Sequence, residues 1–521
     1  MTDLLKKMKK NKQFQMINIS KFFLISTAIL FVITYIIVVF FRIQYPFELE
    51  WMEGSMVDHV MRIIDGKAIY LKPSIEFVPS IYTPFYFYLS AFMSKFTGIG
   101  FFPLRFVSFL SSLGCFALIF SLVKKETKNI FLGFISASLF FAMFRISGAW
   151  FDIARCDSLF LFLLLLSVYI LRFKNSWIWY ITAGLSVSLA FLTKQTTLVI
   201  IIPVIIYLIF TKRQKSLFFI GTALFVIMTS ILILNGITNG WFTYFVLDLT
   251  GSQQIHRINP TLSRLSSFWL KDILATVPVI CCIVVPFVFY KLKNFKTNDL
   301  FYIVLTIGMV GGTWYSRINT SSYNNVLFPA YAIISILFGL SINYLIEIFQ
   351  NLKTAPRKYL MTLIYFLCIL QFIMLIYNPL AQIPTQKDIV AGNKFIKEIG
   401  LIKGEILAMG QGFLPVLAGK KTYAHRQAIY DIYSSGEDSG VSEKLKMELK
   451  VAIKEQKFQA IIINSVGNFH MDEVNKYYKK HKKIFIEKDI FYPVTGLKLS
   501  PRWIYVPKQF EDKKVKNNLQ E

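Results

Sequence analysis

Acidic residues gather in two short polar stretches among the apolar runs of this sequence. Glu50 and Glu53 follow directly after the first apolar run, and Asp152 and Asp157 flank Arg155 in a second stretch. A carboxylate held at a membrane surface can take a proton from a hydroxyl or an amine, or can orient a polar substrate. These four acids are the candidate catalytic residues, with Glu53 or Glu50 as the general base.

Glu50 and Glu53 are three residues apart and would share one face if the chain is helical from Trp51 onward. An apolar stripe follows on that helix, made of Met56, Val60 and Ile63. The stripe predicts a helix that lies on the membrane surface. The alternative is that the two acids only solvate such a helix.

The second stretch allows two interpretations. Asp152 and Arg155 can neutralise each other across one turn and so orient the loop. Alternatively, Asp152 or Asp157 orients the acceptor or supports Glu53, and Arg155 binds an anionic leaving group.

Lys194 stands between two long apolar runs. A cation in such a position costs roughly 2.5–3.5 kcal/mol on insertion scales, so it needs a compensating role. A phosphate head group would compensate it, with Gln195 and Thr193 donating hydrogen bonds. The alternative is a lysine in a tight turn that extends its charge toward water.

Two further polar segments are weaker candidates. The stretch 314–325 contains Arg317 and Asn325 and suits a phosphate or a sugar, or is an ordinary loop. His256 lies in the long segment between Asn235 and Asp272, where a lone histidine is more often structural than catalytic.

The composition indicates a polytopic helical membrane protein. The 521 residues are 55% hydrophobic, with a mean hydropathy of +0.52. Apolar runs of roughly 17–25 residues recur from Phe22 to Tyr377, each long enough to cross a hydrocarbon core of about 30 Å. The first run follows a lysine-rich start and lacks a small-residue cleavage site, which predicts a span rather than a signal peptide.

The net charge of +27 reflects basic caps between the apolar runs. Such caps follow the positive-inside rule, and no groove of interleaved basic and aromatic residues argues for nucleic acid. The spacing of the five cysteines fits neither a disulfide framework nor a zinc site.

We expect about eleven transmembrane helices and a cytoplasmic N-terminus, which places all the basic caps on the inner face. The expected spans are about 22–41, 104–123, 129–146, 158–171, 176–193, 197–211, 216–234, 272–290, 299–313, 326–348 and 358–377.

The segment from Ile81 to Phe96 decides this topology. It is apolar but short, with Pro84 near its start and tyrosines such as Tyr82 that suit an interface. If it crossed, every later basic cap would face outward. We therefore predict a re-entrant or interfacial helix within a first outward loop that spans residues 42–103.

Residues 379–521 have the composition of a soluble domain. Short strands are predicted in GEILAMG, QAIIINS and RWIYVP, and helices in SEKLKMELKVAIKEQ and DEVNKYYKKHKK. The expected organisation is a transmembrane catalytic domain, 1–378, followed by a small extracytoplasmic α/β domain, 379–521.

Several motifs in this order resemble the GT-C superfamily of integral-membrane glycosyltransferases, in particular the protein O-mannosyltransferases and the lipid A aminoarabinose transferases. The motifs are Glu50–Gly54, Asp65–Tyr70, Tyr82–Tyr86, Leu104–Arg105, Asp152–Asp157, Leu192–Gln195 and Asn325–Pro329. The resemblance covers about residues 20 to 380, and the order of the motifs carries more weight than any one of them.

The resemblance implies a donor sugar linked to polyprenyl phosphate. It also implies a plasma-membrane enzyme that moves this hexose or pentose to a glycan, lipid or protein acceptor at the outer face. Family members usually carry an aspartate followed by a glutamate in the first outward loop. Here Met52 precedes Glu53, which leaves the base open between Glu53 and Glu50. A divalent cation bound by Glu50, Glu53 and Asp157 is allowed but not required.

The implied reaction is a single displacement with inversion at the anomeric carbon. A glutamate deprotonates the acceptor, and Lys194, with Arg317 or Arg155, stabilises the departing lipid phosphate. Asn325, Gln195, His256 and Tyr82 are further candidates for binding the substrate. The alternatives are a transporter or flippase of lipid-linked sugars, which would use the cavity without breaking a bond, and an envelope-assembly protein whose C-terminal domain binds glycan.

Overall fold

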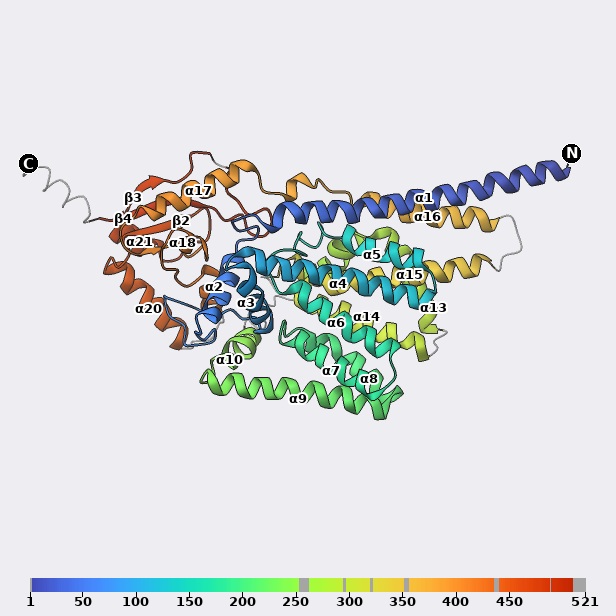
Figure 1. The fold of residues 1–521 in the computed structure, drawn as a ribbon, viewed down its shortest axis with the longest axis horizontal. Coiled ribbons are helices and arrows are strands. Elements are labelled where there is room, and N and C mark those ends of the chain that lie inside the picture. The colour runs from blue at the N-terminus through green and yellow to red at the C-terminus, as the bar shows by residue number, and fades with distance from the viewer. Residues whose placement is uncertain are drawn as a thin grey trace, which may run out of the picture.

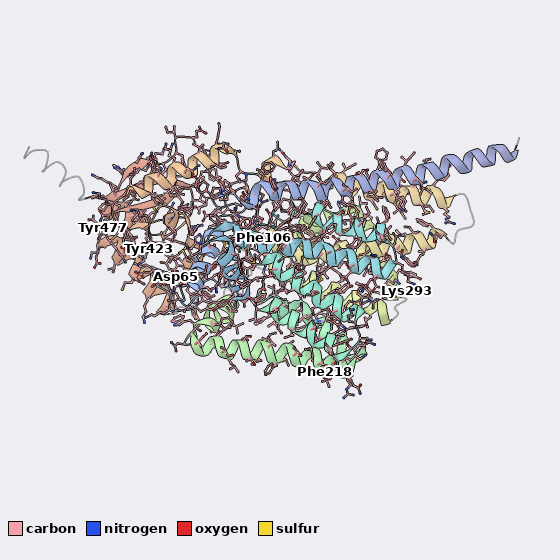
Figure 2. All side chains as sticks on the ribbon, viewed as in Figure 1. Asp65, Phe106, Phe218, Lys293, Tyr423 and Tyr477 are labelled. Carbon is pink, nitrogen blue, oxygen red and sulfur yellow. The ribbon has the colours of Figure 1, made fainter. Side chains whose placement is uncertain are left out.

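The computed structural model describes residues 2–252, 262–293, 297–318, 322–350, 356–434, 440–487 and 489–508. Helices of the N-terminal three quarters run roughly along the long axis of the molecule, and the strands gather at the end opposite the N-terminus (Figure 1). Side chains fill the space between the helices (Figure 2).

The longer helices of the first part follow the apolar runs of the sequence. They are α1 (Thr2–Ile43), α4 (Phe101–Thr127), α5 (Ile130–Ala142), α6 (Asp157–Phe173), α7 (Trp177–Phe191), α8 (Thr197–Thr211), α9 (Arg213–Ile237), α13 (Pro278–Lys293), α14 (Thr297–Ile318), α15 (Phe328–Gln350) and α16 (Pro356–Met374). Shorter helical elements lie between them: α2 (Glu53–Ile64), α3 (Phe85–Thr97), α10 (Trp241–Thr243), η1 (Tyr244–Asp248), α12 (Leu262–Ser267), η2 (Phe268–Leu274) and η3 (Asn324–Leu327).

These helices bury apolar faces against one another. α4 packs on α5 and α6, α7 on α6 and α9, α8 on α14, and α1 on α16. Large apolar side chains also point outward: Phe40 is 73% exposed and Phe225 is 72% exposed. An apolar outer surface of this kind is stable only against lipid.

The chain is an integral membrane protein. Within the described residues, α1 from Met16, α4, α9 and the stretch Asn324–Gln350 are long and apolar enough to cross a membrane. The stretch Leu265–Leu274 and α13 would make one further span, bent by 109°. The predicted number of about eleven spans, and the side on which each terminus lies, stay predictions.

The predicted interfacial segment forms the 13-residue helix α3. At 1.5 Å per residue it is about 20 Å long, which is shorter than the hydrocarbon core. It packs on α2 and α4. Its position relative to the membrane stays a prediction.

The prediction that the apolar stripe of α2 lies on the membrane is wrong. Met56 is 1% exposed and Val60 is fully buried, because α2 packs against α3 and beneath the C-terminal region. Gly54 and Gly412 show how closely the two backbones approach: a Cβ on Gly412 would lie 2.5 Å from the carbonyl carbon of Gly54. Protein, rather than lipid, buries this stripe.

The C-terminal region contains a four-stranded sheet in the order β1-β2-β4-β3, in which β1 and β2 are parallel and the other pairs antiparallel. Its elements are η4 (Leu380–Gln382), α17 (Gln386–Gly400), β1 (Ile406–Leu407), α18 (Leu414–Leu417), α19 (Arg426–Tyr433), α20 (Gly440–Lys454), β2 (Ala460–Asn464), α21 (Met471–Tyr477), β3 (Tyr478–Lys483) and β4 (Pro501–Pro507). The three predicted strands are present.

The helix predicted over DEVNKYYKKHKK is only half correct. Helix α21 ends at Tyr477, and residues 478–483 form strand β3 against β4. Tyr478 explains the switch, since its hydroxyl donates to the carbonyl of Phe458 and anchors the strand. Pairing with β4 thus overrides a local pattern that favours helix.

Candidate functional site

A cavity of about 630 Å³ lies between the loops of the membrane helices and the C-terminal region. A volume of this size is typical of small-molecule sites. Many of the residues predicted from the sequence line it: Glu50, Tyr82, Arg155, Lys194, Gln195 and Asn325. Glu53, Asp152 and Arg317 do not line it.

Glu53 lies in a fully buried cluster around Arg105 of α4. The guanidinium Nε donates to Glu53 Oε1 at 3.0 Å, and Nη2 donates to Oε2 at 2.6 Å. The same guanidinium donates to three backbone carbonyls of the loop after α1, those of Arg42, Tyr45 and Phe47. Arg105 thereby fixes the path of the chain into the first loop.

Backbone amides complete the surroundings of Glu53. Leu49 N donates to Oε2 at 2.6 Å, and Ala154 N donates to Oε1 at 2.6 Å. Burial alone would raise the pKa of Glu53, but the charge of Arg105 and these hydrogen bonds outweigh it and lower the pKa. Glu53 is an ionised carboxylate that joins the two acidic loops.

Glu50 has different surroundings. It is fully buried at the cavity wall, 3.5 Å from Arg155 Nη1. Burial, opposed in part by Arg155, raises its pKa to about 7. In the described part of the chain, Glu50 Oε1 has no hydrogen-bond partner. A carboxylate near its pKa at neutral pH, with an unpartnered oxygen at a cavity, is suited to accept a proton from a substrate.

Arg155 extends this wall of the cavity. Its Nη2 donates to the hydroxyl of Tyr82 at 2.5 Å, and its guanidinium lies 5.0 Å from the centre of that ring. Nη1 also contacts the sulfur of Met52. Among the described residues, the buried Nε of Arg155 has no partner. A buried donor of this kind is normally completed by a water molecule or by a ligand.

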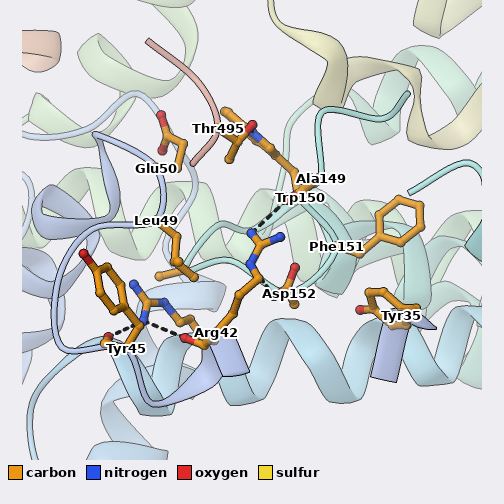
Figure 3. A network of polar contacts seen from close by, with 12 residues as sticks. Tyr35, Arg42, Tyr45, Leu49, Glu50, Ala149, Trp150, Phe151, Asp152 and Thr495 are labelled. Carbon is orange, nitrogen blue, oxygen red and sulfur yellow. Dashed lines mark hydrogen bonds and ion pairs between the residues drawn. The ribbon is translucent and has the colours of Figure 1, made fainter. Parts of the chain in front are cut away.

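Asp152 does not pair with Arg155, which corrects one of the two sequence interpretations. Its carboxylate lies 3.1 Å from Arg42 Nε at the end of α1, and Arg42 also donates to the carbonyl of Ala149 (Figure 3). Burial raises the pKa of Asp152, and Arg42 opposes that effect. The ion pair fixes the second loop to α1, behind the cavity.

Lys194 pairs with Asp157 at the other side of the cavity. The distance from Nζ to Oδ1 is 2.6 Å, and Asn325 Nδ2 donates to the same oxygen at 2.9 Å. The turn that carries Lys194 is docked on the start of α3, where Thr83 donates to the carbonyl of Phe191. The carboxylate of Asp157 thus joins Lys194 to Asn325.

Gln195 positions the neighbouring loop. Its Nε2 donates to the carbonyl of Ile81 at 2.9 Å and to that of Val246 at 3.3 Å. The first of these hydrogen bonds holds the residue before Tyr82 at the cavity. Gln195 is therefore a positioning residue in this structure as well as part of the wall.

Arg317 is engaged elsewhere. It forms a two-pronged ion pair with Asp272, at 2.7 Å and 3.1 Å, and donates to the carbonyl of Ser322. The expectation that it binds phosphate is not supported by this geometry, since two of its guanidinium nitrogens already donate to the carboxylate of Asp272. His256 lies outside the described residues.

The C-terminal region is joined to the site through Thr495. Its amide donates to the carbonyl of Leu49, and its hydroxyl accepts from Trp150 Nε1 at 3.0 Å and donates to the carbonyl of Gly148. Figure 3 shows Thr495 beside Glu50 and Trp150. One threonine thereby connects both acidic loops.

Sequence reasoning missed the wall that the C-terminal region contributes. It consists of Arg426, Gln427, Tyr430 and Asp431 on α19, with Gly496 and Leu497 after Thr495. The aromatic lining was not predicted as such: Trp51 lies in the motif Glu50–Gly54 and Tyr323 in the stretch 314–325, but neither they nor Trp150 were named as binding residues. No local motif marks the residues of the C-terminal region, because only the docking of the two regions brings them to the cavity.

The described residues contain no group of three or more His, Cys, Asp or Glu side chains placed to hold a metal ion. The suggested set of Glu50, Glu53 and Asp157 is not assembled, since Glu53 faces Arg105 and Asp157 faces Lys194.

Comparison with known proteins places this geometry in a fold family. Residues 79–234 match the family model described as dolichyl-phosphate-mannose-protein mannosyltransferase. The structure aligns with that of ArnT from Cupriavidus metallidurans bound to undecaprenyl phosphate, with a TM-score of 0.60 and 10% identity over 92% of this chain and 97% of that one. The chain has a GT-C-like fold.

Two further structures agree. ArnT in the apo state aligns with a TM-score of 0.56 at 10% identity, again over 92% of this chain and 97% of that one. The Archaeoglobus fulgidus oligosaccharyltransferase, in complex with zinc and sulfate, aligns with a TM-score of 0.51 at 11% identity, over 94% of this chain and 73% of that one. No curated protein matches by sequence. The resemblance to GT-C glycosyltransferases predicted from the sequence is confirmed.

Proposed function

We propose that this protein is a glycosyltransferase that moves a sugar from a polyprenyl-phosphate donor to an acceptor at the outer face of the membrane. The observation that carries the proposal is the cavity, which combines an incompletely paired carboxylate, Glu50, with two cations, Arg155 and Lys194. The fold supports it, since ArnT binds undecaprenyl phosphate within the same architecture.

Glu50 is the general base in this proposal, and Glu53 is not. Removing the acceptor proton needs a carboxylate that touches the substrate, and Glu50 lines the cavity while Glu53 faces Arg105. At neutral pH the carboxylate of Glu50, with its pKa of about 7, is about half ionised and can take up a proton. The acceptor oxygen or nitrogen then attacks the anomeric carbon as the phosphate leaves.

Arg155 and Lys194 receive the phosphate. The Nε of Arg155 has no hydrogen-bond partner among the described residues, and Lys194 has donors beyond the one used by Asp157. The lipid phosphate leaves with its own negative charge, so fixed cations at the site stabilise it without a proton donor. The polyprenyl chain stays in the bilayer, which gives a reason for building the enzyme around membrane helices.

The test is transfer of label from undecaprenyl-phosphate sugars, radiolabelled in the sugar, to acceptors in a membrane extract. The purified full chain should move the label, and Lys194→Met should lose most of the activity. Lys215→Met is the matched control, because Lys215 does not line the cavity and donates to Asn175 in an exposed hydrogen bond. Label that crosses a vesicle membrane still attached to its lipid would instead assign the protein to the transporters. Label that neither moves nor crosses would contradict both functions.

A further inference from the structure

The wall of the cavity contributed by the C-terminal region carries a buried carboxylate. Asp431 on α19 is 4% exposed, and Gln427, one turn earlier on the same face, donates from Nε2 to its Oδ1 at 2.9 Å. Both side chains line the cavity. No step of the proposed transfer uses either of them.

This wall and the cations Lys194 and Arg155 belong to different parts of the chain. Lys194 and Arg155 come from the membrane helices and their loops, and Asp431 comes from the C-terminal region. Asp431 is near enough to Tyr82 for its charge to contribute to raising the pKa of that hydroxyl, an effect due mainly to burial. Arg426 also lines this wall, but its guanidinium is engaged by the carbonyl of Gly467. A phosphate is attracted to Lys194 and Arg155 and repelled by Asp431, so the two parts of the lining are suited to different parts of one ligand.

The size of the cavity indicates that its ligand contains a second group besides the phosphate. Its 630 Å³ far exceeds the room that one phosphate group fills. The group beside Asp431 must donate hydrogen bonds to a carboxylate and accept them from an amide, and neighbouring hydroxyls on a ring do both. Tyr430 lines the same wall, is 39% exposed and offers an apolar ring face, whereas Trp51 beside it packs against His425 and Arg426.

We propose that Asp431 and Gln427 form a subsite for the hydroxyl groups of a sugar ring, which lies against Tyr430 at the wall of the C-terminal region. The inference rests on the proposed function and deepens it, since it names the group that selects the sugar. A site built to pair hydroxyls rejects a sugar whose hydroxyls are misplaced, because its own polar groups are then left unpaired.

Binding, rather than turnover, tests this proposal. Tryptophan fluorescence of the full chain in nanodiscs is titrated with undecaprenyl phosphate and with undecaprenyl-phosphate hexoses and pentoses. We expect the preferred glycolipid to bind more tightly than the bare lipid. Asp431→Asn should weaken binding of the glycolipid about tenfold, which is the effect of losing roughly one charged hydrogen bond. Binding of the bare lipid should stay unchanged.

Two variants support the interpretation. Gln427→Ala retains the charge of Asp431 and should cause a smaller loss with the same selectivity for the glycolipid; it replaces Asp431→Asn if that variant does not fold. Tyr433→Phe is the control on the same helix, because the Tyr433 hydroxyl contacts His470 rather than the cavity. It should bind both lipids like the wild type.

The source of the sugar is decided in a second arm, in which methyl glycosides are titrated into protein saturated with undecaprenyl phosphate. If the variants lose affinity only for the glycolipid, the subsite belongs to the donor. If they lose affinity only for the methyl glycoside, it belongs to a saccharide acceptor. The subsite proposal is wrong if the variants lose as much affinity for the bare lipid as for the glycolipid, or if they lose no affinity for either sugar ligand. Failure of the proposed function looks different: Lys194→Met would then bind the bare lipid like the wild type.

Discussion

Two glutamates three residues apart occupy opposite kinds of environment. The carboxylate of Glu53 is fully buried and fully partnered, by Arg105 and by backbone amides from two loops. The carboxylate of Glu50 is equally buried but belongs to the cavity wall, and its Oε1 has no hydrogen-bond partner in the part of the chain that the structure describes. Burial alone therefore does not distinguish the two: the proposal of Glu50 as the base rests on its incomplete pairing and its place in the cavity wall, whereas Glu53 is completely paired.

The largest expected effect is on transfer. Glu50→Gln should lower the transfer rate by about 10²–10⁴-fold, because an amide cannot accept the acceptor proton. Thermal unfolding should show that the variant stays folded. The rate is measured with the radiolabelled donor. If Glu50→Gln had the activity of the wild type, Glu50 would not be the base, and the proposed functional difference between the two glutamates would be wrong.

The next largest expected effect is a loss of stability when the buried cluster of Glu53 and Arg105 is broken. Arg105→Met leaves the carboxylate of Glu53 buried without its cation, which should cost about 3–5 kcal/mol of unfolding free energy. Denaturation in detergent, followed by circular dichroism, measures the loss. The control is Lys67→Met, which breaks the exposed pair with Asp65 and should change little. If Arg105→Met were as stable as Lys67→Met, the structural role of the Glu53 cluster would be wrong.

The pH dependence should separate the two glutamates further. Because Glu50 must be ionised to act, the transfer rate should rise with pH through about 7 and level off above it. One pH unit below that value the rate should be about tenfold below its plateau. A rate that stays constant from pH 5 to about 9 would contradict the assignment of Glu50.

Stability should respond to pH with opposite signs at the two positions. The pKa of Glu53 is lower in the folded state than in the unfolded state, so its contribution is present above about pH 4.3 and lost as the pH falls through the folded value. The folded pKa of Glu50 is raised, so the folded state binds that proton more tightly and loses stability as the pH rises from about 4.3 through 7. Unfolding curves of Glu50→Gln between about pH 4.3 and 7, and of Glu53→Gln below about pH 4.3, measure the two signs.

The smallest expected effect concerns Thr495, through which the C-terminal region contacts the two acidic loops. Thr495→Val leaves Trp150 Nε1 without its acceptor and should cost about 1–3 kcal/mol. Because Thr495 also lies beside Glu50, transfer should fall about tenfold with little change in the binding of undecaprenyl phosphate. Thr495→Ser keeps the hydroxyl and should recover most of the rate. Loss of activity in both variants alike would assign the effect to packing.

The sequence predicted well those residues whose type is unusual for their surroundings. Lys194 was recognisable because a cation between apolar runs is costly, and the structure pairs it with Asp157 at the cavity. The acids of the two loops were recognisable for the same reason. Their partners were not, because Arg42 and Arg105 lie within apolar helices, more than fifty residues from the acids that they bind.

The pattern of apolar runs determined by itself that this chain is a helical membrane protein with a C-terminal region of different composition, since the bilayer imposes length and polarity on every segment that crosses it. The order of its motifs also indicated the GT-C resemblance. Only the tertiary structure distinguished Glu50 from Glu53 and brought α19 and Thr495 to the cavity. That distinction depends on which atoms remain without a partner after folding, a property of long-range contacts that no local spacing encodes.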